Sequence, residues 1–200
     1  MSMKKYVALA GVAMLTLAGC AAPAADTAAP ATSDLKICVY THGDGGTFWS
    51  VAQKGAEQAA ADLGVELDYQ GANNDAAKQA STIEAGVAAG CDGIATSVPD
   101  AEALQGPMDA AKAAGIPTVT MNSGSSAFAK LGAFTHVGQD EVIAGQQAGL
   151  KFNAMGVKHV LCPIQEAGNV GLADRCAGLK QTFKGKAEEF NLDGGLADLT

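Results

Sequence analysis

Short apolar runs alternate with longer stretches of helical periodicity along most of the chain. Runs rich in apolar and β-branched residues predict strands at 37–40, 65–69, 93–97, 118–121, 133–137, 159–162 and 195–199. In the stretches between them, apolar side chains such as Ala52, Ala56 and Leu63 recur at the spacing of one helix face. These stretches predict helices at 48–63, 76–89, 101–114, 142–155 and 172–183.

The regular strand-helix order predicts an α/β fold with a doubly wound parallel sheet. Parallel neighbours need crossover connections, and the helical stretches are long enough to supply them on both faces of the sheet. The last predicted strand, at 195–199, has no helix after it that would cover it. We therefore expect a fragment of a longer protein, or a chain that borrows an element from a partner, and the fragment is the simpler explanation.

The first twenty residues carry a different pattern. Lys4 and Lys5 precede an apolar run over 6–17, which is typical of a signal peptide and too short for a spanning helix. The residues Leu17-Ala18-Gly19-Cys20 resemble the bacterial lipobox, so 1–19 is the predicted signal peptide and Cys20 the lipidated N-terminus. An ordinary signal peptide with an incidental cysteine is the alternative. Residues 20–34, rich in Ala, Pro and Thr, predict a flexible linker, and the protein is expected in the periplasm or at the cell surface, held to the membrane by its lipid alone.

Charge and cysteine content narrow the possible partners and cofactors. The formal charge of −8 becomes −10 without the two signal lysines, which argues against nucleic-acid binding. Four cysteines remain after Cys20, and an oxidising compartment favours pairing. Three connectivities are possible, and we favour Cys38 with Cys91 and Cys162 with Cys176, because each pair would lie within one half of the fold; four buried thiols are the alternative. No cysteines are closely spaced and the three histidines are scattered, so no metal site is predicted.

The candidate chemistry lies in the loops after the predicted strands. In open parallel sheets, ligands bind beyond the carboxyl ends of the strands. The loops at 42–49, 71–75, 98–100, 122–126 and 138–140 carry hydroxyls, amides, a carboxylate and adjacent aromatic rings. Such a mixture suits a neutral polyhydroxylated ligand.

Five segments in a fixed order resemble successive landmarks of type I periplasmic binding proteins, and above all the ribose-binding-like sugar receptors of ABC importers. They are Val39–His42, Thr47–Trp49, Gly93–Asp100, Ala114–Val119 and Val137–Asp140. The resemblance covers Leu35 to Thr200 and implies two hinged lobes that close on a ligand. It also implies a nearly complete first lobe at 35–139, a partial second lobe at 140–200, and a monomer when the protein is full length.

The resemblance also implies which residues bind the ligand. Phe48 and Trp49 match paired aromatics that stack on the sugar, although they could instead begin a helix inserted in the core. Asp100 could equally be the N-cap of the next helix, and Arg175 could be a surface residue paired with Asp174 or Glu166. The complete predicted ligand-binding set is His42, Phe48, Trp49, Ser97, Asp100, Asn122, Ser123, Asn169 and Arg175.

At one place in this set, the chain departs from what related receptors carry. Related receptors often carry Asp-Arg where this chain has Asn122 and Ser123, so this position does not identify the sugar. Gln139 and Asp140 fall between the lobes, and we expect a hinge and capping role for them.

The sequence favours a receptor over an enzyme. The serines at 123, 125 and 126 lack a Gly-x-Ser-x-Gly elbow, and the chain has neither a P-loop nor a dinucleotide fingerprint, so no catalytic residue and no cofactor is predicted. Repressors with the same fold need a helix-turn-helix and a cytoplasmic address, whereas this chain has a lipobox. We therefore expect a substrate-binding lipoprotein that passes a sugar-like solute to an ABC permease. A sensory lipoprotein that signals to a chemoreceptor or histidine kinase is the alternative.

Overall fold

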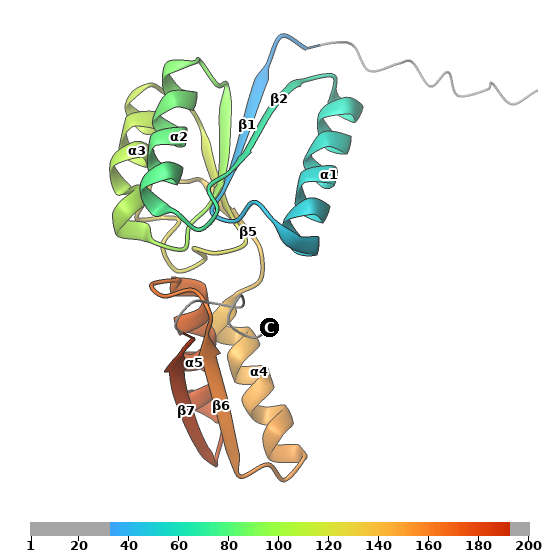
Figure 1. The fold of residues 1–200 in the computed structure, drawn as a ribbon, viewed down its shortest axis with the longest axis vertical. Helices are drawn as coiled ribbons and strands as arrows, with labels where there is room; N and C mark the ends of the chain where they lie inside the picture. The colour runs from blue at the N-terminus through green and yellow to red at the C-terminus, as the bar shows by residue number, and fades with distance from the viewer. Residues whose placement is uncertain (1–32, 193–200) are drawn as a thin grey trace, which may run out of the picture.

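A computed structural model describes residues 33–192, and Figure 1 shows its fold. The elements follow one another in the order β1 (Lys36–Thr41), α1 (Gly46–Leu63), β2 (Glu66–Gly71), α2 (Ala76–Ala88), β3 (Gly93–Ser97), α3 (Ala101–Ala113), β4 (Thr118–Met121), β5 (Thr135–Val137), α4 (Glu141–Ala154), β6 (His159–Ile164), α5 (Val170–Thr182) and β7 (Lys186–Asn191). They form two lobes, which we call the first lobe (β1 to β5) and the second lobe (α4 to β7).

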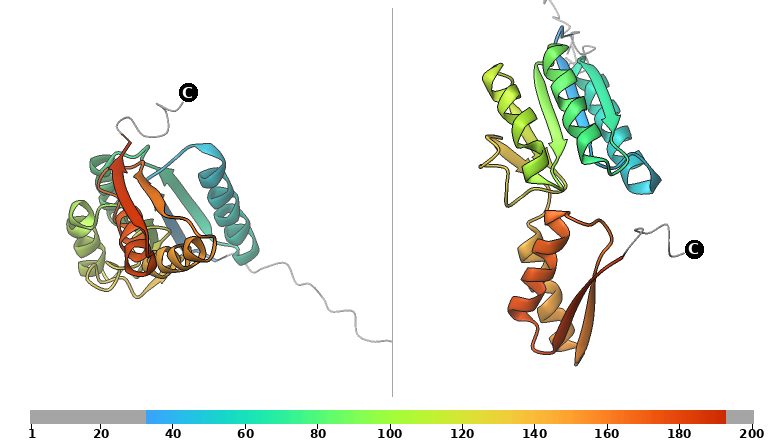
Figure 2. Two further views of the ribbon diagram at one scale, coloured as in Figure 1. Left: turned by 90° about the horizontal axis from the view of Figure 1, so that it is seen from below. Right: turned by 60° about the vertical axis from the view of Figure 1, so that its left-hand side comes forward.

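The first lobe is built on a five-stranded sheet. Its strands run in the order β2-β1-β3-β4-β5, and every neighbouring pair is parallel. Helices α2 and α3 lie side by side on one face and α1 lies on the other, as Figures 1 and 2 show. The predicted doubly wound α/β fold is thereby confirmed, with a nearly complete first lobe and a partial second lobe.

The core of the first lobe lies between the sheet and the pair α2 and α3. Ile83, Leu104 and Met108 from the helices meet Ile94 of β3, and all four are at most 1% exposed. Burying each of these side chains contributes about 1.5–3 kcal/mol. The core therefore fixes the strands whose carboxyl ends carry the loops of interest.

The second lobe pairs two strands with two helices. β6 and β7 form a parallel two-stranded sheet, and α4 packs against α5. A Cβ atom at Gly178 of α5 would lie 2.1 Å from the backbone oxygen of Val142 on α4, so only glycine permits this close approach. The two helices therefore hold their site-facing side chains in a fixed relation.

Each lobe contains one disulfide. One joins Cys38 on β1 to Cys91 just before β3, and the other joins Cys162 on β6 to Cys176 on α5. This is the pairing that the sequence favours over four thiols. Neither bridge crosses between the lobes, so both leave the connection between them unconstrained.

The lobes are joined by the short connection 138–140 and meet where the strands of the first lobe end, as Figure 1 shows. Asp140 accepts a hydrogen bond from the backbone of Ile143 at 3.0 Å and so caps α4. Two hydrogen bonds, in contrast, join one lobe to the other. Val170 N donates to Pro99 O at 2.9 Å, and Ser126 Oγ donates to Asp174 Oδ2 at 2.7 Å.

The structure corrects several sequence expectations. Strand β7 was not predicted, because only Ala187 and Phe190 of its six residues are apolar and most of the strand faces solvent. Most other boundaries shift by one or two residues; α1, for example, begins at Gly46 rather than at Phe48. The predicted signal peptide at 1–19, the predicted lipidation site Cys20, most of the predicted linker and the expected strand at 195–199 lie outside the described residues. Within residues 33–192, no helix has the length and apolar character needed to cross a membrane.

Candidate functional site

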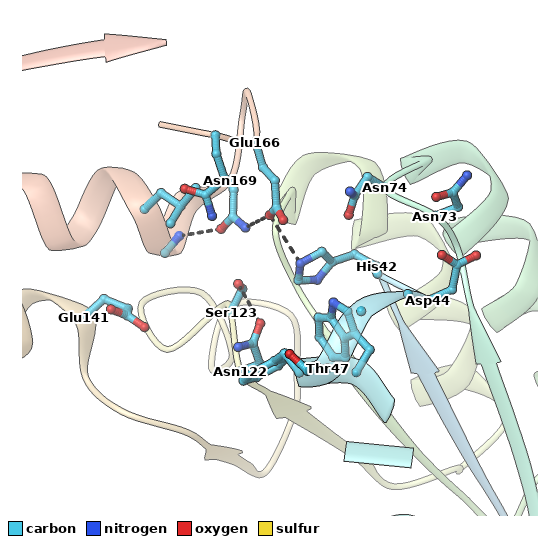
Figure 3. Close-up of a pocket in the computed structure, with 18 of the residues that line it drawn as sticks. His42, Asp44, Thr47, Asn73, Asn74, Asn122, Ser123, Glu141, Glu166 and Asn169 are labelled. Carbon is cyan, nitrogen blue, oxygen red and sulfur yellow. Dashed lines mark hydrogen bonds and ion pairs between the residues drawn. The ribbon is translucent and has the colours of Figure 1, made fainter. Parts of the chain in front are cut away.

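A cavity of about 570 Å³ lies between the two lobes. The first lobe contributes the loops that follow β1, β2 and β4, and the second lobe contributes the start of α4 and the segment from β6 into α5. Seven of the nine predicted ligand-binding residues line it, the exceptions being Ser97 and Asp100. Figure 3 shows that the labelled side chains converge on this space from both lobes.

His42 is placed by the neighbouring strand. It follows β1, and β1 pairs with β3, which ends at Ser97. The Ser97 hydroxyl lies 2.8 Å from the backbone N of His42 and 2.7 Å from its Nδ1, and both residues are buried. Ser97 therefore lies behind His42 and holds its ring, rather than contacting the cavity as the sequence predicts.

The other side of the His42 ring reaches the second lobe. Its Nε2 lies 3.4 Å from Glu166 Oε2, and Asn169 Nδ2 donates to the same oxygen at 2.5 Å. The contact with His42 is the main cause that lowers the pKa of Glu166 below its ordinary value; the bond from Asn169 adds to this effect and burial opposes it. An ionised Glu166 thus links the two lobes beside the cavity, as Figure 3 shows.

The predicted aromatic pair forms one wall of the cavity. Trp49 makes edge contacts with both His42 and Phe48, with ring centroids 4.9 Å apart in each case. Phe48 remains 59% exposed, so this pair begins a helix at the rim of the cavity rather than in the core. Gly43 lies directly behind the indole, since a Cβ atom there would come within 2.0 Å of Trp49 Nε1.

Asn122 and Ser123 line the cavity at the end of β4. The Ser123 hydroxyl donates to Asn122 Oδ1 at 3.1 Å. Asn122 adopts a φ of 60°, a left-handed conformation that asparagine tolerates better than most residues. The tight turn therefore presents an amide and a hydroxyl side by side.

The second lobe contributes a cation from α5. Arg175 Nε donates to Glu141 Oε2 at 2.6 Å, and this bond is the main cause that raises the pKa of Arg175. Gln139 Nε2 donates to Glu141 Oε1 at 3.0 Å. The expected alternative partners of Arg175, Asp174 and Glu166, are engaged elsewhere. Glu141 takes their place because it begins α4, which packs against α5.

Two predicted ligand contacts are also structural caps. Asp100 accepts hydrogen bonds from the backbone of Glu102 and Ala103, each at 3.0 Å, and so caps α3. It lines a neighbouring cavity of about 390 Å³ rather than the main one. Asn169 caps α5 through Gly171 N at 3.0 Å while its amide also reaches Glu166.

Seven polar residues of the cavity wall were not in the predicted ligand-binding set. Asn73 and Asn74 occupy left-handed conformations after β2, and their Asn-Asn sequence in a strand-end loop was the signal for them. Glu141 lies next to the predicted hinge, but its role depends on helix packing that no local pattern shows. The complete set of additions is Asp44, Thr47, Asn73, Asn74, Glu141, Gln165 and Glu166.

The cavity combines hydrogen-bonding groups with aromatic rings. Amides and hydroxyls supply both donors and acceptors, and the Trp49 ring supplies an apolar face. No group of three or more His, Cys, Asp or Glu within residues 33–192 is arranged to hold a metal ion. The arrangement suits a small ligand with several hydroxyl groups.

Comparison with known proteins points in the same direction. A family model described as a periplasmic binding protein domain matches residues 37–197. A xylitol-binding protein of Mycolicibacterium smegmatis is 30% identical over 179 residues, which is 88% of this chain and 49% of that protein.

Solved structures share the fold. A carbohydrate transporter from Acidothermus cellulolyticus 11B, in complex with myo-inositol, is 42% identical with a TM-score of 0.77, over 81% of this chain and 57% of that one. A solute-binding protein from Burkholderia graminis C4D1M, in complex with D-arabinose, is 26% identical with a TM-score of 0.72, over 84% of this chain and 59% of that one. The chain thus spans about half to three fifths of the length of these relatives.

Proposed function

Because this chain belongs to the family of periplasmic binding protein domains, we propose that it captures a small sugar or polyol between its lobes and delivers it to an ABC permease. The observation that carries the proposal is the polar cavity of about 570 Å³, which both lobes line and which an aromatic ring flanks. A six-carbon polyol fits within such a volume, and the wall can pair with its hydroxyls.

The relatives support a polyhydroxylated ligand. Xylitol, myo-inositol and D-arabinose are named for three of them, and all three are small, neutral and rich in hydroxyls. Each would need several hydrogen-bond partners and one apolar surface. Asn122, Ser123 and Asn74 supply partners of this kind, and Trp49 supplies the surface.

We propose binding rather than catalysis at this site. The Ser123 hydroxyl bonds to an amide oxygen, so no base is positioned to activate it. His42 lies against Ser97, but that hydroxyl is behind the ring and away from the cavity.

The proposal extends to the organisation of the whole chain. Residues 1–19 would direct export, lipidated Cys20 would anchor the protein to a membrane, and 20–34 would act as a tether. The lobes would comprise 35–139 and 140–200, with the boundary in the connection where Asp140 caps α4. The protein would act outside the cytoplasm as a monomer.

Isothermal titration calorimetry with a panel of pentoses, hexoses, polyols and inositols tests the proposal. We expect one class to bind and the Trp49→Ala variant to lose roughly tenfold or more in affinity, because tryptophans that contact a ligand often dominate binding. Val51→Ala is a matched control, since Val51 lies on the same helix, is 69% exposed and does not line the cavity. Absence of binding across the panel would overturn the proposal. Uptake of the bound solute by cells that lack the protein separates import from sensing, since only an importer would show reduced uptake.

A further inference from the structure

The charges that face the cavity are unequal. Three carboxylates line it, on Asp44, Glu141 and Glu166, against the one guanidinium of Arg175. These four side chains together carry a formal charge of −2. A negatively charged ligand is therefore repelled from this space, unless it can form an ion pair with Arg175.

Arg175 already forms an ion pair with the carboxylate of Glu141. Its Nε lies 2.6 Å from Glu141 Oε2, which is a charge-assisted hydrogen bond of the short, strong kind. Glu141 is 4% exposed, and Gln139 holds its other oxygen at 3.0 Å. A carboxylate so buried cannot leave its cation without a large loss of free energy, so a ligand does not displace it.

The remaining donors of Arg175 stay available. The bond to Glu141 uses Nε and leaves the two terminal nitrogens, and within residues 33–192 the Arg175 side chain makes no other hydrogen bond. Hydroxyl oxygens can accept from these nitrogens without needing a net positive charge. The Arg175–Glu141 pair can therefore donate hydrogen bonds to a ligand, but it has no net charge that would attract an anion.

We infer that Glu141 is a specificity-determining residue: by neutralising Arg175, it makes the cavity accept neutral polyhydroxylated ligands and reject the corresponding sugar acids. This inference rests on the proposed function and deepens it. It concerns Glu141, which holds the arginine in place, rather than the arginine itself.

Matched ligands that differ by one group test the inference by calorimetry. The pairs are xylitol with D-xylonate and D-glucose with D-glucuronate, and myo-inositol serves as a further neutral probe. We expect the unmodified protein to bind a neutral member and to bind its acid at least roughly tenfold more weakly. In Glu141→Gln, the released guanidinium can form a charged hydrogen bond to the acid, so affinity for the acid should rise roughly tenfold to a hundredfold.

Two further variants separate the pairing from net charge alone. Glu166→Gln removes one negative charge from the same cavity but leaves Arg175 paired, so it should raise acid affinity far less than Glu141→Gln. The double variant Glu141→Gln/Arg175→Gln should not show the increased affinity for the acid, because it lacks the guanidinium. Thermal melting checks that each variant is folded. If Glu141→Gln is not, Glu141→Asp loosens the same pair while keeping the charge, and a smaller gain is expected from it.

The outcomes are distinct. Equal or tighter binding of an acid by the unmodified protein would overturn the inference and leave the proposed function intact. Equal gains in Glu166→Gln and Glu141→Gln would show that net charge, not the pair, sets the selectivity, and would also overturn it. If the unmodified protein binds neither member of any pair nor myo-inositol, the proposed function fails and the inference fails with it.

Discussion

Replacing Gly43 by alanine should disable the aromatic wall without disturbing the fold. The new Cβ atom would lie 2.0 Å from Trp49 Nε1 and 2.5 Å from its Cδ1, whereas ordinary contacts begin at 3.4 Å. The indole must therefore move by about 1.4 Å. The backbone of Gly43 is not in the left-handed region, so alanine adds no strain there.

The size of the effect follows from what the ring contacts. Trp49 makes edge contacts with His42 and Phe48, and each is worth about 0.5–1.5 kcal/mol. Displacing the ring disfavours its ligand-facing position by about 1–3 kcal/mol, which corresponds to a loss of roughly five- to 150-fold in affinity.

The assay can follow both the ring and the ligand. Trp49 is the one tryptophan in the sequence, so the emission spectrum of the protein reports on this ring. Gly43→Ala should shift that spectrum without ligand and weaken binding in calorimetry. Gly45→Ala is the matched control, because a Cβ atom there meets nothing within 4 Å. A shifted spectrum with native affinity would show that the aromatic wall has no part in binding, and an unshifted spectrum would refute the predicted displacement of the ring.

Three further results are expected. The contact with His42 lowers the pKa of Glu166, so this contact stabilises the fold at pH values above the ordinary carboxyl pKa, and the stabilisation is lost as the pH falls through the lowered pKa. The melting temperature measured against pH should show this loss, and the Glu166→Gln variant should show a flatter profile. Replacing Cys38 and Cys91 by alanine should lower the free energy of unfolding by about 4 kcal/mol in denaturant titrations, since the bridge spans 53 positions. Gly178→Ala should cost about 1–3 kcal/mol by forcing α4 and α5 apart, again measured by denaturant titration.

Each of these has its own check. Gly55→Ala, in an open position of α1, should instead stabilise the protein by about 1 kcal/mol. Equal effects at Gly55 and Gly178 would refute the packing argument. An unchanged pH profile in Glu166→Gln would show that another group titrates, and unaltered unfolding after loss of the Cys38–Cys91 bridge would show that it adds no constraint.

The sequence predicts most of the fold because its buried elements carry strong patterns. The strands β1 and β3 at the centre of the first-lobe sheet are largely buried, so they carry apolar runs. Asp75 and Asp100 mark helix starts by capping them. Strand β7 escaped because it is largely exposed and carries charged side chains. A periodic pattern of apolar residues arises from burial, so an exposed strand lacks the pattern by which a strand is predicted.

The site was predicted in part for a similar reason. Loops at strand ends can be located from the sequence, so His42, Asn122 and Trp49 were expected near the ligand, and the structure places them at the cavity. Whether a side chain in such a loop faces the cavity depends on tertiary contacts, which is why Ser97 lies behind His42. The partner of Arg175 depends on the packing of α4 against α5, whereas the sequence offered only Asp174 or Glu166 as alternative partners.

The order of the two disulfides has a consequence for biosynthesis. Cys38 pairs with Cys91 and Cys162 with Cys176, so each bridge joins consecutive cysteines. A chain that emerges from a translocation channel N-terminus first would complete its first bridge before either half of the second appears. Within these 200 residues, Cys20 is the one cysteine outside the two bridges, and acylation would remove its free thiol. Simple oxidation should therefore yield the native bonds without an isomerase, and recombinant secretion should succeed once Cys20 is acylated or replaced.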